Sequence, residues 1–128
     1  MIAAGFGFRT AATPESLADA LHQAAAGRRV ALLAVPADKA HAACLQSLAR
    51  RLRLAVIAIP QATLASATTL TPAPRAANPV RGQGSPAEAA ALAAAGPGAR
   101  LLGPRAVSAD RLATCALAES AAPAMEAP

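Results

Sequence analysis

Three short, continuous apolar runs constrain the fold of this chain more than any other feature. Ile2–Phe8, Val30–Val35 and Leu54–Ile59 each have the length of a β-strand, and a proline directly follows the last two. Runs of this kind are typical of parallel strands that are covered on both faces. With a helical segment between successive runs, the pattern predicts a parallel sheet with right-handed crossovers.

The two segments between these runs carry helix signals. Thr13 is a good N-cap, Pro14 suits the first helical position, and Glu15 favours the positive end of the helix dipole. Gly27 is expected to end this helix. A second helix is expected over about residues 38–53, with Asp38 as its cap and apolar residues at spacings of three and four. Its apolar stripe comprises His41, Cys44, Leu45, Leu48 and Leu52.

A long irregular segment follows the third run. From about residue 65 to 84 the chain is rich in Thr, Pro, Ala, Arg and Gly, and its prolines forbid a long helix. A stretch of this length is expected to be either functional or disordered. Ser85 and Glu88 then form a capping-box pattern, which predicts a helix to about Ala95.

Two short strands are expected to complete the sheet. Arg100–Leu102 and Leu112–Ala118 can pair as an antiparallel hairpin, and the acidic, Ala- and Pro-rich segment 119–128 is expected to be a disordered tail. We therefore predict one α/β domain over residues 1–118. It is a three-layer sandwich with a mostly parallel βαβαβ sheet and a C-terminal helix and strand hairpin.

Composition and charge limit the partners of this domain. Alanine fills 41 of the 128 positions, and 12 Lys and Arg against 7 Asp and Glu give a formal charge of +5. Either codon bias in a GC-rich genome or an anionic ligand, such as a polycarboxylate, explains the basic excess. Nucleic acid is disfavoured, because only Phe6 and Phe8 could stack on bases and both lie in an apolar run.

The sequence gives no sign of a membrane, a metal or an oxidising compartment. No apolar run approaches 18 residues, and the N-terminus lacks the basic region of a secretory signal. Cys44 and Cys115 have no zinc-type spacing and are interpreted as small core hydrophobes. We expect a cytoplasmic protein without a metal or cofactor.

Two groups of residues near the expected carboxyl edge of the sheet are candidates for binding an anion, one after the first strand and one after the second. Gly5 and Gly7 would let the backbone approach a ligand, the helix start at Thr13 would offer N–H groups, and Arg9 could clamp a carboxylate or phosphate. The alternative is a tight turn that needs glycine. Lys39 follows the second strand, at the edge where open α/β sheets bind ligands, or is simply the solvated start of a helix.

Three segments, in this order and spacing, resemble a known family. Ala3–Arg9 is similar to its opening strand and GIGCR-type turn, and Ser85–Gly96 resembles its motif V-A-E-A-A-A-L-x-A-A. Leu101–Arg105, followed by Ala113–Ala118, resembles its closing strands, LLVPKR and TVAIA. The resemblance is to the CobE / CbiG C-terminal domain family of cobalamin biosynthesis and spans about residues 2–118.

The resemblance implies a small α/β domain that takes part in corrin-ring assembly. In CbiG this domain follows others, in a protein that opens the lactone of a ring-contracted cobalt-precorrin and releases acetaldehyde. In the aerobic route it stands alone as CobE, and a chain of one domain looks like that form. The implied ligand is a tetrapyrrole with many carboxylates, and the pathway methyltransferases are candidate protein partners.

The family motifs carry over to part of this sequence. The matching positions are Gly5, Gly7, Arg9, Lys39, Ser85 and Glu88. Phe8 stands where the family usually has Cys, so no thiol chemistry is assigned there. His41 and Ala42 stand where the family has acids after the lysine, which weakens an acid–base role at that site.

Two hypotheses about function follow. The first is a protein that binds a precorrin intermediate, whose ligand contacts would be Gly5, Gly7, Arg9, Thr13, Lys39 and Ser85. The second is a hydrolase or lyase that acts on the lactone of a ring-contracted intermediate, with Glu88 as the candidate acid or base. The capping box alone also explains Glu88, and turnover stays an open question.

Overall fold

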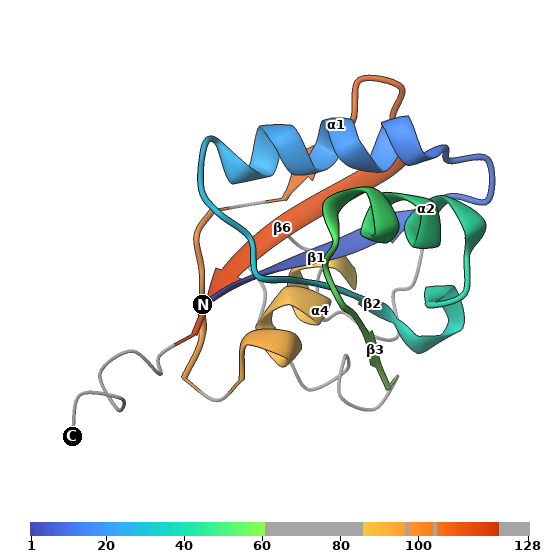
Figure 1. The fold of residues 1–128 in the computed structure, drawn as a ribbon. Helices are drawn as coiled ribbons and strands as arrows, with labels where there is room; N and C mark the ends of the chain where they lie inside the picture. The colour runs from blue at the N-terminus through green and yellow to red at the C-terminus, as the bar shows by residue number, and fades with distance from the viewer. Residues whose placement is uncertain (61–85, 97, 104, 121–128) are drawn as a thin grey trace, which may run out of the picture.

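The computed structural model describes residues 1–60, 86–96, 98–103 and 105–120, and within these ranges helices cover both faces of one sheet (Figure 1). In chain order the elements are β1 (Ile2–Phe8), α1 (Pro14–Ala25), β2 (Leu32–Pro36), the 3-10 helix η1 (Ala37–Lys39), α2 (Ala43–Leu52), β3 (Val56–Ile59), α4 (Pro86–Ala95), β4 (Arg100–Leu101), β5 (Ala106–Val107) and β6 (Ala113–Glu119). The irregular segment expected at 65–84 and the tail from 121 onward lie outside the described residues.

The sheet combines a parallel and an antiparallel part. Its strand order is β3-β2-β1-β6-β4, and β5 also pairs with β6. β1 pairs with β2 and β2 with β3 in parallel, as the apolar runs predict. β6 lies antiparallel to β1 along its whole length, and β4 and β5 both pair antiparallel with β6. The three-layer α/β fold is confirmed. The sheet is mixed because β6, which lies next to β1, runs antiparallel to it.

The second helical segment differs from the sequence-based expectation. η1 and α2 replace the continuous helix expected from Asp38, and Asp38 lies within η1. The N-cap of α2 is Ala42, without a side-chain cap hydrogen bond, so the cap assigned to Asp38 is wrong. β2 extends through Pro36 and η1 follows it directly, so α2 begins only at Ala43. His41 and Leu52 are exposed, whereas Leu45 and Leu48 are buried as expected.

The C-terminal strand is longer than expected. Glu119 belongs to β6, pairs with Ile2 in register, and forms an ion pair with Arg100 at 3.1 Å. The N–H of Ser120 donates to the carbonyl of Met1 at 2.9 Å. The ordered chain therefore passes the boundary expected at residue 118, because β1 supplies a partner strand up to the N-terminus.

Large apolar side chains fill the face of the sheet covered by α1 and α2. Its fully buried members include Phe6, Leu17, Leu33, Val35, Leu45 and Cys115. Burial raises the pKa of the Cys115 thiol, which is a core residue as expected. Cys44 is half-buried against the same cluster.

Alanine fills almost all of the opposite face, which α4 covers. The buried members of its two clusters are Ala3, Ala34, Ile59, Ala89, Ala90, Ala91, Ala95 and Ala118. The helix lies so close to the sheet that a Cβ on Gly5 would be 2.0 Å from the Ala87 carbonyl oxygen and 2.5 Å from the Ala91 nitrogen. Glycine at position 5 is therefore required by this close approach.

Candidate functional site

The carboxyl ends of β1 and β2 bring two predicted site residues, Arg9 and Lys39, to one edge of the sheet. Arg9 directly follows β1 and is exposed, while its backbone N–H donates to the Leu112 carbonyl at 2.9 Å. Lys39 ends η1, and its Nζ lies 5.3 Å from the centroid of the Phe8 ring at the end of β1. Arg9 and Lys39 therefore follow parallel strands at the same edge of the sheet, and their joint contact with a ligand stays a prediction.

Neither cation at this edge is neutralised by an acid of the described ranges. The ion pairs of the described residues are Arg51–Glu15 at 3.4 Å and Arg100–Glu119 at 3.1 Å. Neither pair involves Arg9 or Lys39. The Phe8 ring contacts the ammonium of Lys39 through a cation–π interaction. This edge therefore presents two positive charges suited to carboxylates.

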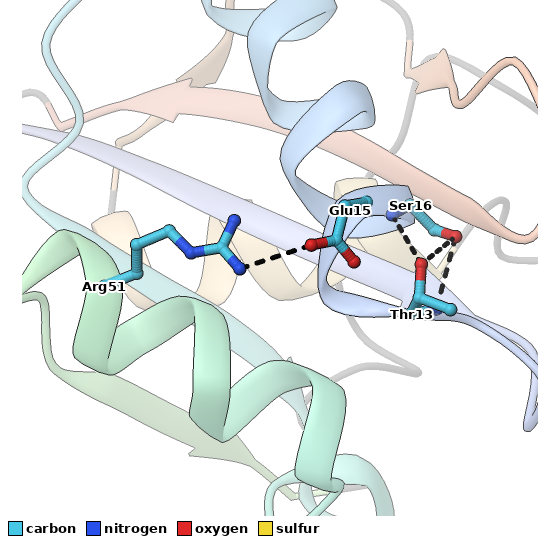
Figure 2. Close-up of polar contacts among 4 residues, drawn as sticks. All are labelled: Thr13, Glu15, Ser16 and Arg51. Atoms are coloured by element: carbon cyan, nitrogen blue, oxygen red, sulfur yellow. Dashed lines mark hydrogen bonds and ion pairs between the residues drawn. The ribbon is translucent and has the colours of Figure 1, made fainter.

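The start of α1 is capped by its own residues (Figure 2). Thr13 Oγ1 accepts from the Ser16 N–H at 3.1 Å, and the Thr13 N–H donates to Ser16 Oγ at 3.2 Å, as a capping box. Arg51 of α2 reaches Glu15 in the first turn at 3.4 Å. Thr13 is the N-cap as predicted, but its backbone N–H is already used, so it does not offer that donor to a ligand.

A carboxylate from the β5–β6 turn also accepts a hydrogen bond from the first turn of α1. Asp110 accepts from the hydroxyls of Ser16 and Ser108 and from the N–H of Leu112. The hydrogen bonds from Ser108 and Ser16 lower the pKa of the Asp110 carboxyl. The positive end of the helix is thus occupied by an internal anion. Local sequence patterns could not indicate this contact, because Asp110 and its partner Ser16 on α1 are 94 positions apart.

The two glycines of the expected turn both lie within β1. Gly5 pairs with Ala34 and Ala116 in the middle of the sheet, where it accommodates α4. Gly7 pairs with Thr114, whose Oγ1 donates to the Gly7 carbonyl at 3.2 Å. The strand predicted over Ile2–Phe8 is therefore confirmed, and the alternative of a tight turn at these glycines is wrong. Backbone contacts from these glycines to a ligand stay a prediction.

The candidate acid–base residue Glu88 is fully buried in the first turn of α4. Its Oε2 accepts from the backbone N–H of Arg105 at 3.3 Å, so the carboxylate joins α4 to the segment between β4 and β5. Sequence reasoning missed this contact, because Arg105 carries no local signal for it. Ser85, the other half of the expected capping box, lies outside the described residues.

The described part of the chain contains neither a metal-binding cluster nor a membrane-spanning helix. No group of three or more His, Cys, Asp or Glu that could hold a metal ion occurs there. No helix there has the length and apolar character needed to cross a membrane.

The comparisons with known proteins agree with this architecture. The sequence matches the family described as cobalamin synthesis G C-terminus over residues 2–118. The crystal structure of CobE, a protein from the cobalamin (vitamin B12) biosynthetic pathway, has a TM-score of 0.80 and 32% identity, and the match covers 92% of this chain and 89% of that one. No curated protein sequence gives a significant match.

Two further structures are similar to this one. The cobalamin biosynthesis protein chiG from Agrobacterium tumefaciens has a TM-score of 0.74 and 33% identity, and the match covers 94% of this chain and 99% of that one. A cobalamin biosynthesis protein G homolog from Sulfolobus solfataricus, at 16% identity and a TM-score of 0.66, shares the fold over 91% of this chain and 36% of its own. The chain belongs to the CbiG C-terminal family and is a cobalamin biosynthesis protein of the CobE/CbiG C-terminal type.

Proposed function

We propose that this protein binds a precorrin intermediate of cobalamin biosynthesis at the carboxyl edge of its sheet. The observation that carries the proposal is the contact of the Lys39 ammonium with the Phe8 ring at the end of β1, directly before Arg9, with neither cation in an ion pair with an acid of the described ranges. Corrin precursors carry several peripheral carboxylates, which are suitable partners for an ammonium and a guanidinium. The Phe8 ring adds an apolar surface next to the two charges.

Binding without chemistry is the form of the proposal that the site favours. Arg9 and Lys39 can hold and orient carboxylates, but the acids that follow this lysine in the family are absent here. The described residues also contain no thiol at the end of β1, where Phe8 stands. The protein would then bind and present the intermediate, with a pathway methyltransferase as one class of partner.

An absorbance titration tests this proposal. Purified protein is mixed with hydrogenobyrinic acid, a stable analogue of the ring-contracted intermediates, and the Soret band is followed at two salt concentrations. We expect a saturable shift with weaker affinity at high salt, because salt screens the contacts between exposed charges. The double variant Arg9→Ala/Lys39→Ala should raise the Kd at least tenfold.

A second double variant is the matched control for charge. Arg28→Ala/Arg29→Ala also removes two exposed positive charges, but between α1 and β2, at the opposite edge of the sheet. This variant should bind almost as the wild type does. An equal loss in both variants would mean that only net charge matters, and no shift at high micromolar ligand would reject corrinoid binding and direct attention to protein partners.

The second candidate function is a hydrolase or lyase acting on the lactone of a ring-contracted intermediate. The complete burial of Glu88 is the observation that favours this role, because acids are rarely found fully buried. Its contact with the N–H of Arg105 favours a structural role equally well. Glu88→Gln should abolish turnover and spare binding if Glu88 is an acid or base, and unchanged turnover would remove it from that role.

Nucleic-acid binding gains no support from the fold. Phe6 is fully buried beneath α1 and α2, so it cannot stack on a base. Phe8 already faces the Lys39 ammonium.

A further inference from the structure

The side chain of Arg105 contains a charged nitrogen that lacks an acceptor among the described residues. Its Nη1 is shielded from solvent and donates no hydrogen bond to any of them. An arginine stays protonated in proteins, so this nitrogen cannot lose its charge to avoid the cost. Buried polar groups nearly always have a partner, and a missing one calls for an explanation.

The backbone of the same residue is firmly held. The Arg105 N–H donates to Oε2 of Glu88 at 3.3 Å, and Glu88 is fully buried in α4. That helix is itself pressed against β1 at Gly5. This hydrogen bond ties the backbone of Arg105 to α4, while Nη1 of its guanidinium has no acceptor among the described residues. Such preorganisation is typical of a binding residue.

The sheet register gives the position of Arg105 relative to the carboxyl edge. Ala106 pairs with Cys115, so Arg105 aligns with Ala116, which pairs with Gly5 in β1. Two strand spacings and three residues of rise put its backbone about 14 Å from that of Phe8. Phe8 packs on the α1 and α2 face, whereas Glu88, which holds the Arg105 backbone, belongs to α4 on the opposite face. One carboxylate cannot bridge this separation, so a ligand that contacts both positions has to be large and has to pass over the carboxyl edge of the sheet.

We propose that Arg105 binds a second carboxylate of the ligand, apart from the one held by Arg9 and Lys39. The inference rests on the proposed function and extends its site from the Phe8 end of β1 to the α4 side of the sheet. The planar guanidinium would hold the carboxylate by charge-assisted hydrogen bonds. Nη1 would gain its missing acceptor when the groups that shield it from solvent move aside on binding. Glu88 is then a positioning residue, since it acts on the backbone of Arg105.

The same titration with hydrogenobyrinic acid tests the inference. Arg105→Gln should raise the Kd at least tenfold, and Arg105→Lys, which keeps the charge but loses the planar fork, should recover part of the loss. Arg100→Gln is the matched control, because Arg100 is an exposed arginine of the neighbouring strand β4 paired only with Glu119 in the described ranges. That variant should bind as the wild type does.

An amidated form of the ligand separates recognition from structure. If Arg105 binds a carboxylate, the difference between wild type and Arg105→Gln should disappear when the peripheral carboxylates are amides. A Kd for Arg105→Gln equal to wild type, with unaltered circular dichroism, would overturn the inference and leave the proposed function standing. Absence of binding by the wild type would reject the proposed function, and this inference with it.

Discussion

The two faces of the sheet are packed in opposite ways. On the α1 and α2 face, side chains such as Phe6, Leu17 and Leu45 fill the space between the layers. On the α4 face, nearly every buried residue is alanine, and the helix backbone itself approaches β1 at Gly5. A chain with 41 alanines thus builds one thick layer from its few large residues and one thin layer from close contact. Truncating a buried side chain should therefore destabilise the thick layer most, whereas enlarging one should destabilise the thin layer most.

Enlarging Gly5 is the strongest test of the thin layer. In Gly5→Val the new Cβ would lie 2.0 Å from the Ala87 carbonyl oxygen, and backbone atoms cannot move aside as the end of a flexible side chain can. The cost should exceed the roughly 1–3 kcal/mol that is typical of overpacking. We expect loss of cooperative urea unfolding and of native circular dichroism.

Gly27 provides the control for this test. A Cβ on Gly27 would meet nothing within 4 Å, although its φ of +90° disfavours other residues. Gly27→Ala should therefore cost only about 1–2 kcal/mol, from backbone strain alone. Equal stability of the Gly5 and Gly27 variants would show that α4 can shift away from the sheet.

Truncation of Leu45 probes the thick layer. Leu45 is fully buried in α2, so Leu45→Ala leaves a cavity and should lower the free energy of unfolding by about 2–5 kcal/mol. The counterpart in the thin layer is Ala91→Gly, which removes one methyl group and should cost about 1 kcal/mol, mainly through helix propensity. Urea titrations of both variants give the comparison, and a larger loss for Ala91→Gly would contradict it.

The capping box of α1 is expected to matter less than the core. Thr13→Ala removes the oxygen that accepts from the Ser16 N–H, and it should cost about 0.5–2 kcal/mol. Thr13→Ser keeps that acceptor and should retain most of the stability. Thermal melts of the two variants test this, and an equal loss in both would mean that the methyl group of Thr13, not its hydroxyl, stabilises the helix.

Patterns that act over short distances along the chain could be predicted. The strand at Ile2–Phe8, the cap at Thr13 and the parallel order of the first three strands are local or follow from chain order. The cap assigned to Asp38 was wrong, because a tight turn after Pro36 competes with the helix start. In the N-terminal half, helix and strand propensity and apolar periodicity therefore predicted the elements correctly, except at the junction between β2 and α2.

Contacts between distant segments could not be predicted. The need for glycine at position 5 arises only because α4 packs against β1, and no residue near Gly5 in the sequence indicates that contact. The acceptor for the Arg105 N–H is likewise a residue 17 positions away, on a helix that the sequence presents as a simple capping box. At the candidate site, the sequence could place Arg9 and Lys39 at one edge of the sheet, because parallel strands bring their carboxyl ends together whatever their side chains are. Their contact with a ligand stays a prediction.

The pH dependence of the Asp110 contact should be the smallest of these effects, because Asp110 is exposed. Hydrogen bonds from Ser108 and Ser16 lower the pKa of its carboxyl in the folded protein, so the carboxylate stabilises the fold above about pH 4 and stops doing so as the pH falls through the lowered value. Asp110→Asn should therefore be less stable than wild type at pH 7, and the gap should narrow by pH 3. Urea midpoints of both proteins at the two pH values measure that gap, and because the other acids are the same in both proteins, they largely cancel in the comparison. A gap that stays constant would mean that shape rather than charge at Asp110 joins the β5–β6 turn to α1.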